Sequence, residues 1–224
     1  MTAARSQPSP ARRRSRKTHG ERSEIPTTSP NTALSRCQPI PAPALPEGFR
    51  YEADVISADD ERTLLAHVRA LPFREFEFHG YVGKRRTVSF GWRYDFEART
   101  LREADDVPEF LLPLRAVAAR FAGLPPDALQ QVLVTEYDAG AGIGWHRDKA
   151  VFGDVVGISL LAPCRFRLRR QMGDAWERVS LVAEPRSAYL LRGPSRTEWE
   201  HSIPAVDARR YSITFRNLRD DLRR

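Results

Sequence analysis

The stretch that decides the fold lies near the C-terminus and reads Arg210-Tyr211-Ser212-Ile213-Thr214-Phe215-Arg216. Its polar and apolar residues alternate, and side chains two residues apart on a β-strand point to the same face. One face is therefore apolar and suited to packing, whereas the other presents two arginines, a serine and a threonine. An edge strand with a solvated face fits this pattern too. Burial of the two guanidinium groups would demand anionic partners, which a dicarboxylate supplies.

Short β-like segments fill the chain before this strand. Gly, Pro and Asp turns separate them at short, regular intervals, which is typical of a closed or sandwiched all-β unit. Two helical patterns come earlier: one starts at Ser57, with Asp60 three residues later, and one covers 107–121. The predicted strands are 131–137, 155–162, 165–170, 176–182, 187–191, 199–203 and 210–216.

A candidate metal site lies in this β unit. His146 and Asp148 are two residues apart, so an extended segment places them on one face, and His201 follows near the other end of the unit. Two imidazoles and one carboxylate leave three coordination positions open, which suits non-haem Fe(II) and O₂. Taken alone, His146, Asp148 or His201 could equally be a chance surface residue. A zinc site would expect thiolates or a third histidine, for which the domain offers Cys164, His67 and His79.

Taken together, these features resemble the AlkB-like family of Fe(II)- and 2-oxoglutarate-dependent dioxygenases, which remove alkyl groups from damaged nucleic-acid bases. The resemblance covers roughly 131–218, with a looser match over 73–96. It implies a mainly β, α+β fold: a double-stranded β-helix, or jelly roll, buttressed by two or more helices. The matching residues are Tyr137, the glycine-rich loop 140–144, His146-Arg147-Asp148, Trp199-Glu200-His201-Ser202-Ile203-Pro204 and the Arg210–Arg216 motif.

The resemblance also implies the roles of individual residues. His146, Asp148 and His201 would be the catalytic iron ligands. Arg210 would pair with the distal carboxylate of 2-oxoglutarate, and Arg216 would lie near its metal-chelating end.

Three further residues would contact the co-substrate. Tyr137 would donate a hydrogen bond to it. Thr135 and Ser212 stand where the family usually has asparagine, and their hydroxyls can still donate hydrogen bonds, but with a shorter reach.

The segment 73–100 resembles the family's substrate lid. Arg85 and Arg86 would hold phosphates, and Trp92 or Tyr94 would stack on a flipped-out base. For the aromatic residues we favour another interpretation, because those between 90 and 96 alternate like one face of a core strand.

Two more features near the site have open interpretations. Trp145, beside His146, would wall the substrate pocket or simply pack. The three arginines that alternate along the predicted strand 165–170 fit a phosphate track and a solvated face equally well.

The charge of the chain is unevenly distributed. The formal net charge is +7, and residues 1–48 contain eight basic residues against three acidic ones. This proline-rich segment predicts a disordered basic tail, either solvated or holding phosphate backbone, ahead of a catalytic domain over 49–224. Two cysteines indicate a reducing, cytoplasmic location, although the Arg/Ser-rich start also overlaps with organellar targeting peptides.

The function implied by the resemblance is oxidative dealkylation of DNA or RNA bases such as 1-methyladenine, 3-methylcytosine and etheno adducts. The reaction would require Fe(II), would consume O₂ and 2-oxoglutarate, and would release succinate, CO₂ and an aldehyde. We expect a monomer with no obligate protein partner and no membrane span. The alternatives are the same chemistry on a tRNA modification, a protein or a small molecule, and a non-catalytic jelly-roll module that binds nucleic acid.

Overall fold

The computed structural model describes residues 44–78 and 81–219. Residues 1–43 of the predicted basic tail lie outside the described residues. The helices are α1 (Ala58–Val68), α2 (Leu112–Ala122) and the single turn α3 (Pro194–Thr197). The first strands are β1 (Phe49–Glu52), β2 (Arg74–Phe78), β3 (Tyr81–Phe90), β4 (Trp92–Asp95) and β5 (Thr100–Glu103). The later strands are β6 (Gln131–Tyr137), β7 (Ile143–His146), β8 (Phe152–Leu160), β9 (Cys164–Met172), β10 (Ala175–Ala183), β11 (Ala188–Leu191), β12 (Glu200–Ile203) and β13 (Arg210–Leu218).

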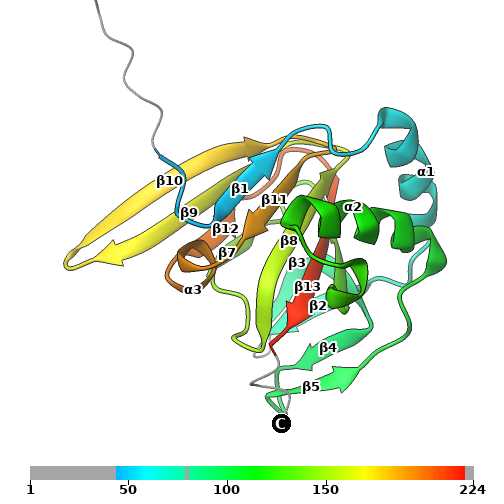
Figure 1. Ribbon diagram of the computed structural model, residues 1–224, viewed down its shortest axis with the longest axis horizontal. Helices are drawn as coiled ribbons and strands as arrows, with labels where there is room; N and C mark the ends of the chain where they lie inside the picture. The colour runs from blue at the N-terminus through cyan, green and yellow to red at the C-terminus, as the bar shows by residue number, and fades with distance from the viewer. Residues whose placement is uncertain (1–43, 79–80, 220–224) are drawn as a thin grey trace, which may run out of the picture. The chain divides into compact units, whose positions relative to one another are not determined.

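Two antiparallel sheets form the jelly roll that was predicted. The larger has seven strands in the order β1-β11-β8-β13-β6-β3-β2, and the smaller has four in the order β10-β9-β12-β7. Strand β13 pairs with β6 on one side and with β8 on the other, so the edge-strand alternative is wrong. Helices α1 and α2 lie together over one face of the larger sheet (Figure 1). No helix within the described ranges is long and apolar enough to cross a membrane.

The two faces of β13 serve two different layers. Tyr211, Ile213 and Phe215 belong to the apolar core beneath α1 and α2, as their alternation predicted. The opposite face carries Arg210 and Arg216 into the space between the sheets, where both are buried. A second apolar cluster, which includes Phe166 and Tyr189, fills the rest of this space. The fold thus places two buried guanidinium groups inside the jelly roll.

The first helix begins as its sequence predicted. The Ser57 hydroxyl accepts a hydrogen bond from the backbone N–H of Asp60, and the Asp60 carboxylate accepts one from the backbone N–H of Ser57. Such a capping residue typically stabilises a helix by about 1 kcal/mol. The apolar face of α1 then packs into the core through Leu64, Leu65 and Val68.

The aromatic residues between 90 and 96 do not form one core strand, and that interpretation is wrong. Strand β3 ends at Phe90 because Gly91 has a φ of +70°. A Cβ at this position would overlap the carbonyl oxygen of Gln130, so only glycine fits. The chain then enters a separate hairpin of β4 and β5, on which Trp92 and Tyr94 are only half-buried.

Gly157 on β8 provides a test of the packing between the sheets. A Cβ there would overlap the ring of Tyr189, which is buried against Phe166. We expect Gly157→Ala to lower the free energy of unfolding by about 1–3 kcal/mol, because the ring has to move within a filled core. Thermal denaturation should show a Tm lower by roughly 2–12 °C.

A matched control for this substitution is Gly144→Ala. Its φ is not positive and a Cβ there meets open space, so the Tm should not change. A Gly157→Ala protein as stable as the unmodified chain would contradict the packing described for the Tyr189 ring.

Candidate active site

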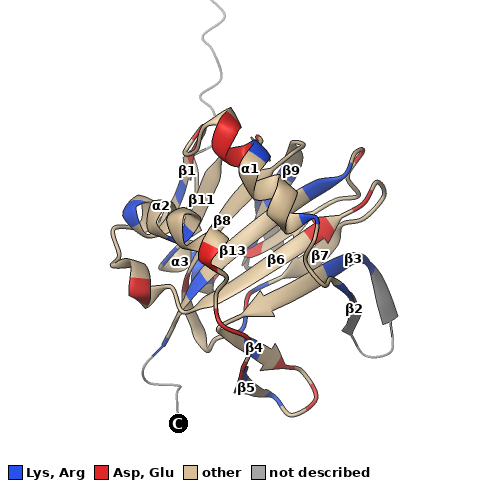
Figure 2. Cartoon of the chain, turned by 90° about the vertical axis from the view of Figure 1, so that its right-hand side faces the viewer, with Lys and Arg blue, Asp and Glu red and all other residues tan. Residues whose placement is uncertain are grey.

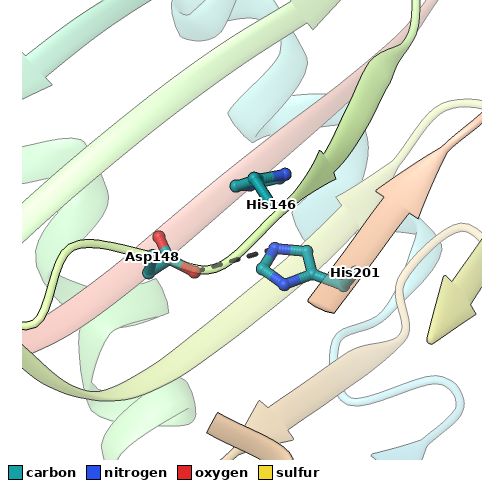
Figure 3. Close-up of side chains that lie close together, drawn as sticks. All are labelled: His146, Asp148 and His201. Atoms are coloured by element: carbon teal, nitrogen blue, oxygen red, sulfur yellow. Dashed lines mark ion pairs between the residues drawn. The ribbon is translucent and has the colours of Figure 1, made fainter. Parts of the chain in front are cut away.

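Three polar side chains converge between the sheets. His146 is the last residue of β7, Asp148 follows in the next loop, and His201 lies on β12. The register of β7 and β12 places His201 opposite His146, with their ring centroids 4.2 Å apart. One ligand atom from each of the three residues lies within 4.8 Å of the others, and Figure 3 shows the side chains facing one another. The structure therefore brings together the predicted iron ligands.

Hydrogen bonds orient two of these side chains. His146 Nδ1 lies 2.9 Å from the carbonyl oxygen of Gly144, and a proton on Nδ1 leaves Nε2 as the free ligand atom. Asp148 Oδ1 accepts a hydrogen bond from Arg216 Nε at 2.9 Å and is ion-paired with Arg216 Nη2 at 2.7 Å. The other oxygen, Oδ2, is buried with no hydrogen-bond partner among the described residues and lies 3.7 Å from His201 Nε2. A divalent cation at this point would satisfy the carboxylate.

The surroundings keep these groups in the protonation states that a metal requires. Burial, followed by the neighbouring His146, lowers the pKa of His201 to about 3. Burial also lowers the pKa of His146. Burial alone would raise the pKa of Asp148, but Arg216 and the two histidines outweigh it and hold that pKa below its ordinary value. Neutral imidazoles and an ionised carboxylate are the forms that bind metal.

The inner face of β13 carries a second group suited to binding, the buried Arg210 guanidinium. Arg210 is 1% exposed, and its guanidinium lies 4.9 Å from the centroid of the Tyr137 ring. Its Nη2 donates to the Ser159 hydroxyl at 2.9 Å, whereas Nε and Nη1 have no hydrogen-bond partner within the described part of the chain. A buried guanidinium with two unpaired donors fits a carboxylate, which accepts from both.

Buried hydroxyl groups form the floor between Arg210 and Arg216. Thr135, Ser212 and Ser159 stand in register across β6, β13 and β8. These are the predicted co-substrate positions on β6 and β13, with a third hydroxyl from β8 that sequence reasoning missed. The inner face of β13 thus carries an arginine at each end of this hydroxyl floor.

The two lid arginines point to opposite faces of β3. Arg85 is in register with Tyr137, on the face that also carries Arg210. Arg86 donates to the buried Glu136 carboxylate from Nε at 2.8 Å and from Nη2 at 2.5 Å. The phosphate-binding roles of both arginines stay predictions. Two of the donors of Arg86 are already hydrogen-bonded to Glu136.

The aromatic residues predicted to contact substrate also separate. Tyr94 lies near the loop between β7 and β8 that carries Asp148 (the metal loop), because the ammonium of Lys149 in that loop is 5.0 Å from the centroid of the Tyr94 ring. Trp92 is half-buried on the same strand. Trp145 instead lies against Arg167 and Arg169, at 4.8 Å and 4.5 Å, on the face of β7 opposite to His146. The structure therefore supports the packing interpretation of Trp145 rather than a pocket wall.

Arg196 is a positioning residue that the sequence did not reveal. It is buried on α3 and donates to three backbone carbonyl oxygens, those of Lys149, Phe152 and Gly153, at 2.7–2.9 Å. These carbonyls belong to the loop that follows Asp148 and to the first two residues of β8. Because α3 also precedes His201 in the chain, Arg196 ties together the segments that carry two of the ligands.

We expect Arg196→Met to weaken Fe(II) binding by roughly 10–100-fold, the usual effect of removing a group that orients a ligand. The long apolar side chain preserves volume but leaves the three carbonyls without their donor. Fe(II) titration under anaerobic conditions measures the change, with circular dichroism to verify the fold. Arg178→Met, on the exposed part of β10, is the control. Equal Fe(II) affinities for the two variants would contradict the positioning role.

The fold and the donor set define a non-haem Fe(II) oxygenase site with two histidines and one carboxylate. The chain belongs to the 2OG-Fe(II) oxygenase superfamily, whose family model matches residues 54–216. Its relatives include several AlkB homologues, and it is an AlkB-like dioxygenase. The orphaned Asp148 oxygen fits Fe(II), and the unpaired Arg210 donors fit 2-oxoglutarate. When bound, these two groups supply the O₂-dependent oxidation.

Two relatives have names that state an activity. The Arabidopsis thaliana protein "Alkylated DNA repair protein ALKBH8 homolog" is 27% identical over 205 residues, covering 75% of this chain and 57% of that protein. The Mus musculus "tRNA (carboxymethyluridine(34)-5-O)-methyltransferase ALKBH8" is 24% identical over 169 residues, covering 71% of this chain and 24% of that protein. The chain therefore spans about half the length of the Arabidopsis protein and about a quarter of the length of the mouse protein.

Solved structures share the fold. OsALKBH1 has a TM-score of 0.61 at 19% identity, covering 79% of this chain and 100% of that chain. A Pseudomonas putida prolyl-4-hydroxylase has a TM-score of 0.51 at 14% identity, covering 77% of this chain and 93% of that chain. At these identities the likeness concerns the fold alone.

Proposed function

We propose that this AlkB-like dioxygenase oxidises an alkyl group on a nucleic-acid base. An alkyl group attached to nitrogen then leaves as an aldehyde and restores the base. The observation that carries the proposal is the aromatic hairpin beside the metal loop. Tyr94 and Phe96 make an edge-to-face pair with ring centroids 5.2 Å apart, and Lys149, the residue after Asp148, lies 4.9–5.0 Å from both rings.

Such a group of side chains suits a nucleotide. Aromatic rings provide stacking surfaces for a flipped-out base, and a neighbouring cation suits the phosphate or the base edge. Tyr94 is half-buried and Phe96 is 37% exposed, so the pair is accessible rather than enclosed in the core. The names of the Arabidopsis and mouse relatives concern DNA repair and tRNA, and they support a nucleic-acid substrate for this chain as well.

In this proposal, different residues of the chain bind the co-substrate and orient the metal ligands. Arg210 and Arg216 hold the co-substrate by its carboxylates, and the hydroxyl floor accepts or donates the remaining hydrogen bonds. Phe166 stacks on the His201 ring with centroids 5.5 Å apart, which fixes the imidazole and keeps water from that side of the site. A non-catalytic binding module would require neither the metal triad nor the arginine pair, and the superfamily assignment makes the chain an enzyme.

The experiment is a turnover assay with oligonucleotides that each carry one alkylated base. The protein is supplied with Fe(II), 2-oxoglutarate and O₂, and mass spectrometry follows the loss of the alkyl group while succinate is quantified. We expect at least one DNA or RNA oligonucleotide to be converted with one succinate per alkyl group. Succinate production without conversion of any modified oligonucleotide would contradict the proposed substrate class while leaving the oxygenase intact.

A further inference from the structure

A buried tyrosine on the inner face of the larger sheet carries a hydroxyl group that the chain does not pair. Tyr189 lies on β11 and belongs to the apolar cluster between the sheets, where it is 7% exposed. Its ring packs against Phe49 and Phe166, with centroids 6.5 Å and 4.5 Å away. These aromatic contacts hold the ring in place but provide no partner for its polar end.

The hydroxyl end of the Tyr189 ring reaches across the neighbouring strand. Tyr189 is in register with Gly157 on β8, and a Cβ at Gly157 would overlap Cζ, Cε1 and the hydroxyl oxygen of the ring. The ring therefore extends from β11 over β8, toward β13. Figure 2 shows β11, β8, β13 and β6 following one another across the larger sheet. Because glycine has no side chain, position 157 leaves the space that the phenol group occupies.

This direction brings the hydroxyl toward the part of β13 that carries the two arginines. Gly157 is opposite Thr214, which lies between Arg210 and Arg216 on the inner face of β13. A dicarboxylate held by both arginines would lie along this face. Tyr137 approaches the same face from β6, on the other side of β13. Such a ligand would therefore have a tyrosine on each side.

The electrostatic surroundings of Tyr189 agree with this position. Burial raises the pKa of the Tyr189 hydroxyl, and Tyr137 and Asp148 raise it further, whereas Arg210 and Arg216 oppose them. The groups that act on Tyr189 are thus a metal ligand and residues assigned to the co-substrate. Because the pKa is raised, the hydroxyl keeps its proton at neutral pH and can donate a hydrogen bond.

The Tyr189 hydroxyl makes no hydrogen bond to any residue that the structure describes. Its neighbour Tyr51, in register with it on β1, differs in this respect, because the Tyr51 hydroxyl accepts a hydrogen bond from the backbone N–H of Glu184 at 3.1 Å. A buried polar group without a partner costs free energy, so such groups call for an explanation. A ligand with an anionic oxygen beside Tyr189 would supply one.

We infer that Tyr189 is a further co-substrate-binding residue, whose hydroxyl donates a hydrogen bond to a carboxylate oxygen of 2-oxoglutarate. Tyr137 and Tyr189 then contact the co-substrate from opposite sides, and Arg210 and Arg216 bind its charged ends. The inference goes beyond the proposed function, because it holds for any substrate that the oxygenase accepts.

The test measures 2-oxoglutarate binding to the full chain loaded with Fe(II), without O₂ and without an oligonucleotide. The visible charge-transfer absorption of the complex reports the Kd. Tyr189→Phe removes the hydroxyl and keeps the ring, and we expect it to raise the Kd for 2-oxoglutarate roughly 10- to 150-fold, the range for a hydrogen bond to a charged group. Fe(II) affinity and Tm in the absence of 2-oxoglutarate should not fall, because the hydroxyl has no partner among the described residues.

Two further variants sharpen the test. Tyr51→Phe is the matched control: it breaks the hydrogen bond to Glu184, so any effect falls on Tm, and the Kd for 2-oxoglutarate should be unchanged. Gly157→Ala displaces the Tyr189 ring without altering the hydroxyl, and it should raise the Kd as well.

The outcomes separate the inference from the rest of the account. An unchanged Kd in a folded Tyr189→Phe protein would overturn it, and so would an equal increase in Tyr51→Phe. A loss of Fe(II) affinity in Tyr189→Phe would also overturn it, because the effect would then lie at the metal ligands. If Tyr189→Phe does not fold, Gly157→Ala decides, and a normal Kd in that protein overturns the inference. Failure of the oligonucleotide assay would contradict the proposed function alone, because this titration contains no nucleic acid.

Discussion

Asp148→Asn should abolish Fe(II) binding and turnover. The substitution preserves the shape of the side chain but removes the negative charge that faces the metal position and that is hydrogen-bonded and ion-paired to Arg216. We therefore expect a loss larger than the roughly 10–100-fold effect of residues that only orient a ligand. Anaerobic Fe(II) titration and succinate production measure the two effects.

The same substitution should also destabilise the folded chain. It leaves the buried Arg216 guanidinium without its carboxylate, and breaking a buried ion pair typically costs about 3–5 kcal/mol. The control is Asp138→Asn, which breaks the exposed pair with Arg209 and should change neither Fe(II) affinity nor Tm measurably. An Asp148→Asn protein that binds Fe(II) as tightly as the Asp138→Asn protein would contradict the assignment of the triad.

Arg210→Met should raise the KM for 2-oxoglutarate by roughly 30- to 5000-fold, which corresponds to the loss of about 2–5 kcal/mol for one partner of a buried charge pair. The substitution removes both unpaired donors but keeps a long side chain against the Tyr137 ring. Initial rates at varied 2-oxoglutarate concentration measure the effect.

Two further measurements separate co-substrate binding from a structural role for Arg210. Fe(II) affinity in the absence of 2-oxoglutarate should be unchanged, because among the described residues Arg210 donates to Ser159 and to none of the three metal ligands. Stability without co-substrate should be equal or higher, because a buried guanidinium with unpaired donors is lost. A variant that is strongly destabilised but binds 2-oxoglutarate normally would contradict the pocket assignment.

Much of the fold was predictable because apolar and polar residues alternate along β13. Alternation at Tyr211, Ile213 and Phe215 specified the helix-covered face, and the arginines specified the inner one. The alternation depends on local geometry, which repeats every two residues in a strand. The i, i+2 spacing of His146 and Asp148 likewise predicted convergence, although β7 ends at His146 and Asp148 lies in the loop that follows.

Other features depend on contacts that no local pattern encodes. Arg196 acquires its role only because α3 folds back on the loop after Asp148. The break at Gly91 depends on the distant carbonyl of Gln130. Strand β8 was predicted to run to residue 162, but it ends at Leu160, because Leu161 has a φ of +76°.

The lid arginines illustrate the same limit. Adjacent residues on a strand point to opposite faces, so only one of Arg85 and Arg86 could face the site. The choice between them depends on the register of β3 against β6, which places Arg85 beside Tyr137 and Arg86 beside Glu136. Sequence alone predicted a cationic lid, and the register decides which of its two arginines shares a face with Tyr137.

The most direct test of the Fe(II)- and 2-oxoglutarate-binding site is an anaerobic titration of the full chain with Fe(II) and 2-oxoglutarate, followed by the visible charge-transfer absorption of the complex. We predict saturation at one Fe(II) per chain, with absorption that requires 2-oxoglutarate. The absorption should be absent in Asp148→Asn and should require far more 2-oxoglutarate in Arg210→Met. A folded, unmodified chain that gives no such absorption, or an Asp148→Asn protein that gives it in full, would contradict the account.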